Sequence, residues 1–214
     1  PLQNIGRAPI LRHPRPAEKG GAISFASPRV QPARSVTAIK QEDLVQSVAD
    51  ALQYISYYHP VDYIRSLAAA HEREESPAAK DAMAQILINS RMCAEGHRPI
   101  CQDTGIVTVF LDVGMDVRWD GATMSVDDMI NEGVRRAYNL PENVLRASIL
   151  ADPAGARKNT KDNTPAVIHY SIVPGNTVEV DVAAKGGGSE NKSKMAMLNP
   201  SDSIVDWVLK TVPT

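Results

Sequence analysis

A cysteine stands beside an amide and a carboxylate in the segment PICQDTG, residues 99–105. Cys101 offers a soft metal ligand, Gln102 a hydrogen-bond donor and Asp103 a group for proton transfer. An apolar stretch that predicts a strand follows directly. We therefore expect the three side chains on a loop, where functional residues concentrate. The alternative interpretation is that Cys101 is a small buried hydrophobic residue without a chemical role.

Three glycines form a second cluster, in the segment KGGGSENK at 185–192. A loop of this kind after a strand can expose several backbone N–H groups to an anion, and glycine lets a ligand come close to the backbone. The spacing is not that of a Walker phosphate-binding loop. A flexible turn is the alternative.

Basic side chains form a third cluster, made of Arg146 and the segment RKNTKDN at 157–163. An arginine side chain suits carboxylate binding, because its planar guanidinium donates two parallel hydrogen bonds. The default interpretation of 157–163 is a solvated loop.

A zinc site is the alternative for the cysteines, because Cys93, His97 and Cys101 form a C-x3-H-x3-C pattern. Structural zinc takes four ligands, and this pattern supplies three. Gly96 is also expected to end a helix between Cys93 and His97. Both points disfavour zinc.

Apolar spacing predicts three helices before the first strand. Over 44–55, apolar residues recur every three or four positions, as in an amphipathic helix that ends before His59-Pro60. A second helix is expected over 61–74, and Ser76-Pro77 predicts the start of a third, which Gly96 ends. The buried face of this third helix is expected to hold Met83, Ile86, Leu87 and Met92.

The later part of the chain mixes strands and helices. Residues 106–111 are rich in β-branched side chains and predict a buried strand, and a capped helix is expected over 125–138. Segments 166–172 and 177–182 flank a Pro-Gly-Asn turn and predict a β-hairpin. Ser201 is expected to cap a last helix. A helical first half followed by mixed elements, without regular βαβ alternation, predicts the α+β class.

The composition limits the classes of function. The 214 residues are 43% hydrophobic and carry a net charge of -2, so the chain can bury a core and has no overall field to attract nucleic acid or an anionic membrane. The apolar runs are far shorter than the roughly 18 to 20 residues of a membrane-spanning helix. Two cysteines are too few for a disulfide framework, which favours a reducing compartment.

Residues 1–36 are expected to be an extension or a disordered arm, because they hold six prolines and six basic residues against one acid, Glu18. The prolines would break the amphipathic helix of a mitochondrial presequence, so a cytoplasmic location is favoured. The first methionine is Met83, which predicts a processed or partial product.

Read together, the clusters resemble class I fumarate hydratases and related iron-sulfur hydro-lyases, such as the α part of L-tartrate dehydratase. The resemblance covers about residues 37–214, as the N-terminal lobe of such an enzyme. It is carried by GHRPICQDTG at 96–105, ARKNTKDNTPAVIHY at 156–170, AAKGGGSENKSK at 183–194 and MLNPSDSIVDWVLKTVPT at 197–214.

The resemblance implies reversible hydration of fumarate to L-malate by a homodimeric enzyme with a 4Fe-4S cluster. Three cysteines hold the cluster, and one open iron acts as a Lewis acid. Cys101 matches the first cluster ligand. Gln102 and Asp103 match residues against the dicarboxylate substrate, and Asp103 is expected to protonate the leaving hydroxyl. Arg146 matches a carboxylate-binding arginine, and Gly188 a glycine lining the substrate site. Other candidates for the arginine are Arg135, Arg136 and Arg157.

The chain departs from the family pattern, because the other two cluster cysteines, the catalytic base and further arginines belong to segments beyond residue 214. Cys93 lies too close to Cys101 in sequence to replace them. We therefore expect the chain alone to be inactive and to lack the cluster. A tartrate dehydratase or another hydro-lyase, and a nonenzymatic assembly module, are the alternatives.

Overall fold

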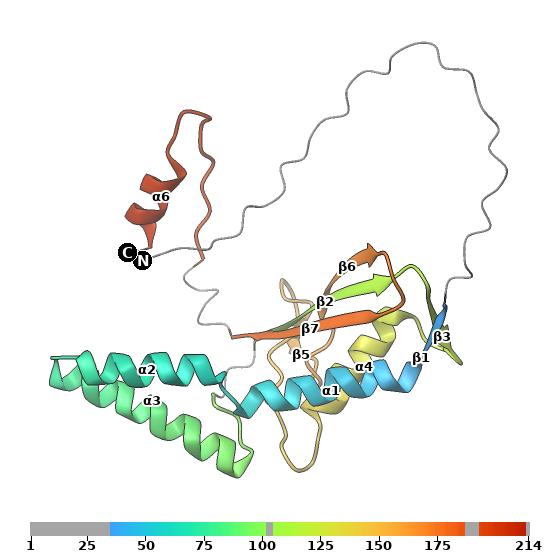
Figure 1. Cartoon of the computed structure of the whole chain (residues 1–214), viewed down its shortest axis with the longest axis horizontal. Helices are drawn as coiled ribbons and strands as arrows, with labels where there is room; N and C mark the ends of the chain where they lie inside the picture. Colours follow the sequence, from blue (N-terminus) through green and yellow to red (C-terminus); the bar gives the residue numbers. More distant parts are fainter. Residues whose placement is uncertain (1–34, 102–104, 187–192, 213–214) are drawn as a thin grey trace. The chain divides into compact units, whose positions relative to one another are not determined.

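The computed structural model describes residues 35–101, 105–186 and 193–212. The chain divides into two units, Pro1–Arg34 and Ser35–Thr214, and every described residue belongs to the second. Its elements follow in the order β1 (Thr37–Lys40), α1 (Gln41–Tyr57), α2 (Val61–Arg73), α3 (Pro77–Gly96), β2 (Ile106–Gly114), β3 (Val117–Asp120), α4 (Val126–Tyr138), β4 (Leu150–Ala151), β5 (Lys158–Asn159), β6 (Val167–Val173), β7 (Val178–Lys185) and α6 (Ile204–Thr211) (Figure 1). The predicted α+β class is confirmed.

The helix boundaries follow the predicted capping signals. Ser76 caps α3 by accepting a hydrogen bond from the Ala79 N–H, and Ser125 caps α4 by accepting one from the Asp128 N–H at 3.1 Å. After Gly96, the backbone of His97 adopts a left-handed conformation with φ 48° and ends α3. Local chemistry therefore fixes where these helices start and stop.

The main sheet has three strands in the order β6-β2-β7, with β2 parallel to β6 and antiparallel to β7. The predicted hairpin is wrong in its pairing, because β2 separates its two strands. The reason lies at the end of β2, where the N–H groups of Gly114, Met115 and Asp116 donate to carbonyls of Thr177, Val173 and Gly175. The turn between β6 and β7 thus wraps over the end of β2.

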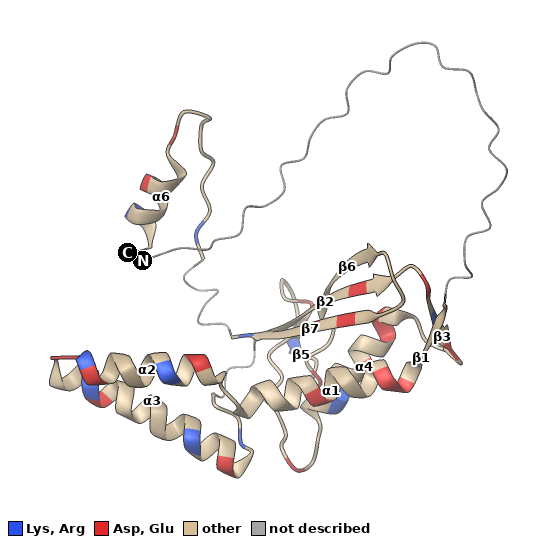
Figure 2. Ribbon diagram, in the orientation of Figure 1, with Lys and Arg blue, Asp and Glu red and all other residues tan. Residues whose placement is uncertain are grey.

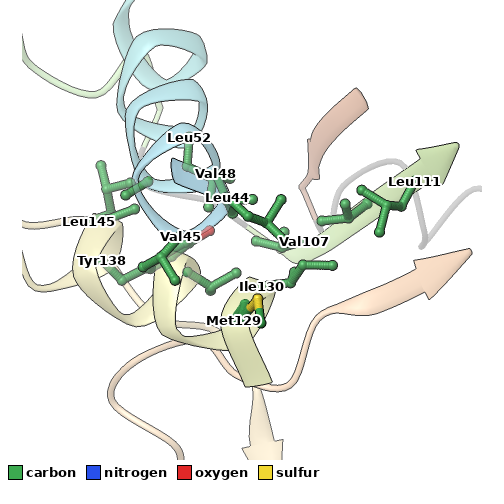
Figure 3. Packing of buried hydrophobic residues seen from close by; sticks show 14 residues of the cluster. Leu44, Val45, Val48, Leu52, Val107, Leu111, Met129, Ile130, Tyr138 and Leu145 are labelled. Carbon is green, nitrogen blue, oxygen red and sulfur yellow. The ribbon is translucent and has the colours of Figure 1, made fainter. Parts of the chain in front are cut away.

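The core lies between one face of this sheet and the helices α1 and α4. Figure 3 shows apolar side chains of α1 and α4 directed at one another and at β2. Val45 and Val48 of α1, Ile130 of α4, and Val107 and Val109 of β2 are all fully buried. Gly133 lets the two helices approach closely, since a Cβ there would lie 2.7 Å from the Val45 carbonyl oxygen.

Three further expectations are corrected. β1 precedes α1 and pairs with β3, so three helices do not come before the first strand. On α3, Ile86 and Met92 are exposed, because α3 packs mainly against α2, which itself buries no residue. The last helix is capped by Ser203 and not by Ser201, since the acceptor bonded by the Asp206 N–H is the Ser203 hydroxyl.

Charges of both signs occur along the helices α2 and α3 (Figure 2). One ion pair joins α1 to α4, between Glu42 and Arg136, and within α4 the Arg136 Nε lies 3.1 Å from Glu132 Oε1. Within the described ranges, no helix combines the length and the apolar character needed to cross a membrane.

Candidate functional site

Two of the predicted clusters meet at one end of the sheet. Ile106, the first residue of β2, is paired with Lys185, the last residue of β7. The cysteine segment leads into β2 and the glycine segment follows β7. Both segments therefore join the sheet at the same end of these two neighbouring strands. Gly105 is needed at this crossing: its φ is +59°, and a Cβ there would lie 1.5 Å from the Lys185 carbonyl oxygen.

Cys101 borders a pocket of about 220 Å³ beside this end of the sheet. Its side chain is exposed, and the neighbouring Pro99 and Ile100 line the same pocket. Ala184 of β7 lines it too, one residue before Lys185. The remaining wall comes from α1, the turn after α1, the last residue of α4 and the segment after α4: Leu52, Ile55, Ser56, His59, Tyr138 and Leu145.

Arg146 directly follows a pocket residue. Leu145 is buried, and its N–H donates to the Tyr138 carbonyl at 3.2 Å. This bond fixes the backbone on which Arg146 stands, and the Arg146 side chain is exposed. Arg146 therefore lies next to the pocket because it directly follows Leu145 in sequence.

Two of the three rival arginines, Arg135 and Arg136, form ion pairs. Arg135 lies 3.1 Å from Asp162 Oδ2 and also contacts Glu132. Arg136 pairs with Glu42 and Glu132. These ion pairs connect helices and loops and use the guanidinium groups for structure. Arg146 stays the carboxylate-binding candidate because it directly follows the pocket residue Leu145.

A buried amide pair anchors the segment that carries Arg146. The Nε2 of Gln53 donates to the carbonyls of Ala137 at 2.6 Å and Asn143 at 3.0 Å. In return, Asn143 Nδ2 donates to Gln53 Oε1 at 2.8 Å. Because buried polar groups are costly unless they are paired, this network holds residues 137–143 firmly against α1.

The solvated-loop interpretation of 157–163 is wrong for Asn163, which is fully buried. Its Oδ1 accepts hydrogen bonds from the N–H groups of Ser148 and Ile149, and its Nδ2 donates to the Gly105 carbonyl. The polar composition of the segment did not reveal this role, and its other side chains are indeed at least partly solvent-accessible. A usable signal was the residue type, since asparagine tolerates the left-handed backbone that Asn163 adopts at φ 60°.

Two titratable groups near these loops have shifted pKa values. Partial burial lowers the pKa of His59, so its imidazole is neutral at pH 7, and His59 Nδ1 lies 3.0 Å from Ser90 Oγ. Burial alone would raise the pKa of Asp162. Hydrogen bonds from Thr164 and Arg135 outweigh burial and hold that pKa below its ordinary value.

The structure tests only part of the predicted site. Gln102, Asp103 and Gly188 lie outside the described residues. Cys93 is buried, with its Sγ 3.6 Å from the Pro99 carbonyl oxygen, and it forms no disulfide with Cys101. Over the ranges described, no group of three or more metal-ligating side chains gathers in one place.

Comparison with known proteins gives the family. The model of the family described as fumarate hydratase (Fumerase) matches residues 45–214. A putative L(+)-tartrate dehydratase subunit alpha of Methanocaldococcus jannaschii is 30% identical over 171 residues, which are 77% of this chain and 59% of the relative.

Two relatives named as fumarate hydratases match a similar part of the chain. Fumarate hydratase class I, anaerobic, of Escherichia coli is 29% identical over 78% of this chain and 31% of the relative. Fumarate hydratase 2 of Leishmania major is 28% identical over 85% and 33%. The chain thus spans between 31% and 59% of the lengths of these proteins. With a family model matching most of its length, the chain belongs to the fumarate hydratase (Fumerase) family, as the resemblance predicted.

Proposed function

We propose that this chain carries part of the active site of an iron-sulfur hydro-lyase that interconverts fumarate and L-malate. The proposal rests on one observation. The cysteine segment and the glycine segment join the sheet at the pair Ile106 and Lys185, beside the pocket bordered by Cys101. Residues that act on one small diacid must lie within a few ångströms of each other. The pairing of Ile106 with Lys185 supports that proximity.

The donor chemistry at the pocket fits one position of a cluster site. Cys101 presents an exposed thiol at the pocket border, and thiolates are the usual ligands of iron-sulfur clusters. The described residues supply no set of three metal ligands, so the proposal requires two cysteines beyond those of this sequence. A bound 4Fe-4S cluster would supply Lewis-acid polarisation of the substrate hydroxyl.

The residues of the chain would bind the diacid and move a proton. Arg146, exposed beside the buried Leu145, is proposed to bind one carboxylate through two parallel hydrogen bonds. Asp103 is proposed to protonate the leaving hydroxyl, with Gln102 donating to the substrate. Gly188 is proposed to line the site, where the absence of a side chain leaves room for the second carboxylate.

Tartrate is the second candidate substrate. The relative named as a tartrate dehydratase subunit alpha is as similar to this chain as the relatives named as fumarate hydratases, and the chain covers a larger share of it. Fumarate, L-malate and L-tartrate are all four-carbon diacids. The named relatives therefore support the dicarboxylate class more firmly than one member of it.

The test uses the protein that contains this chain together with the additional cysteines, loaded with iron and sulfide without oxygen. Hydration of fumarate, followed as the loss of its ultraviolet absorbance, is expected to exceed dehydration of tartrate. Faster turnover of tartrate would reverse the order of the two candidates. Absence of turnover with both diacids would reject the proposed function.

The two cysteines give a matched pair for the metal role. In that protein, Cys101→Ser is expected to lose the cluster signal in EPR and ultraviolet-visible spectra along with turnover. Cys93→Ser is the control, because Cys93 is buried under the same segment with its Sγ near the Pro99 carbonyl. If Cys101→Ser kept a stoichiometric cluster, Cys101 would not be a ligand.

A further inference from the structure

Asn163 is a buried polar residue whose amide touches two different parts of the candidate site. The side chain is fully buried, on a loop where most neighbouring side chains reach solvent. A buried amide is stable only when its donors and acceptors find partners. The partners of Asn163 therefore show which groups the loop holds in place.

The three hydrogen-bond partners of the Asn163 amide are backbone groups of segments that carry proposed site residues. Asn163 Nδ2 donates to the Gly105 carbonyl at 3.1 Å, two residues after Asp103. Asn163 Oδ1 accepts from the N–H groups of Ser148 at 2.6 Å and Ile149 at 3.2 Å, two and three residues after Arg146. One planar amide thus joins the two segments directly.

We propose that Asn163 is a positioning residue that sets the separation between Gly105, at the entry to β2, and the segment of the carboxylate-binding arginine. The catalytic consequence of this inference rests on the proposed function. The link itself, which is the set of hydrogen bonds from Asn163 to the two segments, rests on geometry alone. Only an amide meets both ends: an aspartate could not donate to the Gly105 carbonyl, and an aliphatic side chain could bond neither segment. The planar group has no rotatable bond between donor and acceptor, so the spacing it imposes is narrow.

The loop that presents Asn163 is itself fixed. Asn159 Nδ2 donates to the Ala147 carbonyl at 2.8 Å, and the Thr160 N–H donates to the Ile149 carbonyl at 2.9 Å. Asp162 accepts from both the N–H and the hydroxyl of Thr164 and contacts Arg135 on α4. Because the loop is held in place, its hydrogen bonds can fix the positions of the two segments. In a flexible loop, Asn163 would move together with the groups it bonds.

The link is tested by replacing Asn163 with glycine in the 214-residue chain. Glycine accepts the left-handed backbone at φ 60° and removes all three hydrogen bonds. Lys161→Gly is the control, since Lys161 has φ 72° and an exposed side chain. Amide hydrogen exchange at Ser148 and Ile149 is expected to become roughly three- to tenfold faster in Asn163→Gly and to stay unchanged in Lys161→Gly. Unchanged exchange in Asn163→Gly would overturn the link.

The catalytic consequence is tested in the cluster-loaded protein, well below its melting temperature. Asn163→Gly is expected to lower kcat/KM for fumarate by about 10- to 100-fold at full cluster content, because small misplacements of reacting groups are costly. Asn131→Ala is the control for stability: Asn131 also bonds two backbone groups, the Ala166 N–H and the Asp127 carbonyl, and contacts neither site segment.

Asn163→Asp separates a positioning role from a merely structural one. It keeps the acceptor for Ser148 and Ile149 and loses the donor to Gly105, so exchange at those two amides should remain slow while kcat/KM falls. Turnover equal to that of Asn131→Ala in both Asn163 variants would overturn the positioning role. A wild-type protein without turnover on either diacid would instead reject the proposed function, and the exchange result would still decide the link.

Discussion

Gly105→Ala should destabilise the fold strongly, although it adds a single methyl group. Two separate costs act at this position. The backbone has φ +59°, a conformation that a residue with a Cβ adopts only with strain. The added Cβ would also lie 1.5 Å from the Lys185 carbonyl oxygen and 2.7 Å from the Gly186 Cα, and both of these are backbone atoms that cannot rotate away.

The magnitude follows from adding the two costs. Left-handed backbone without glycine costs roughly 1 to 2 kcal/mol. Forcing packed backbone apart costs about 1 to 3 kcal/mol more, as in other overpacked sites. The sum, roughly 2 to 5 kcal/mol, is a large fraction of the about 5 to 15 kcal/mol by which domains are stable.

Gly121→Ala isolates the backbone part of the cost. Gly121 has φ +62°, and a Cβ there would meet no atom within 4 Å. Both variants also restrict the unfolded chain equally, so that contribution cancels between them. Urea unfolding of the 214-residue chain should give a free energy of unfolding that is about 1 to 3 kcal/mol lower for Gly105→Ala than for Gly121→Ala. Equal values would refute the close crossing of the cysteine and glycine segments.

Three further outcomes are expected. Gln53→Ala should lower the free energy of unfolding by about 2 to 4 kcal/mol, because it strands buried carbonyls, whereas Gln46→Ala, at an exposed side-chain contact, should change it by less than about 0.5 kcal/mol. Partial burial and the hydrogen bond that Tyr170 donates to Asp127 raise the pKa of its hydroxyl, so stability should fall as the pH rises above the unfolded-state value near 10, and Tyr170→Phe should flatten that fall between about pH 10 and 12 in urea midpoints. Asp103→Asn in the cluster-loaded protein should keep the cluster and lower kcat for malate by about 10² to 10⁴; wild-type kcat would exclude the role given to Asp103.

The elements that the sequence predicted correctly are those with local signals. Ser76 with Pro77 and Ser125 with Asp128 mark helix starts through contacts within one turn, and the structure has α3 and α4 at those starts. The α1 periodicity reports a buried face, and that face packs on α4. Such signals need no knowledge of the rest of the chain.

Apart from the cap of the last helix, which is Ser203 and not Ser201, the errors in pairing and burial concern partners that lie far away in sequence. The strands on either side of Pro174-Gly175-Asn176 were expected to pair with each other, but they pair with β2, which precedes them by more than fifty residues. Likewise, the periodicity of α3 could not report that α2 covers only part of its surface. Pairing and burial depend on what the fold brings alongside, which short-range patterns do not encode.

The difference between local signals and long-range partners also applies to the candidate site. It separates the proposed reactive residues from the residue proposed to position them. Cys101 and Arg146 could be named from residue type because their chemistry belongs to their own side chains. Asn163 could not, because its role exists only where the Gly105 carbonyl and the Ser148 N–H come within reach of one amide. Three loops form one site only when hydrogen bonds such as these hold them together. Burial of the amide keeps those hydrogen bonds away from competing water. In the proposed site, where a diacid would lie between loops, a buried amide in a polar loop segment can therefore matter as much as the reactive side chains.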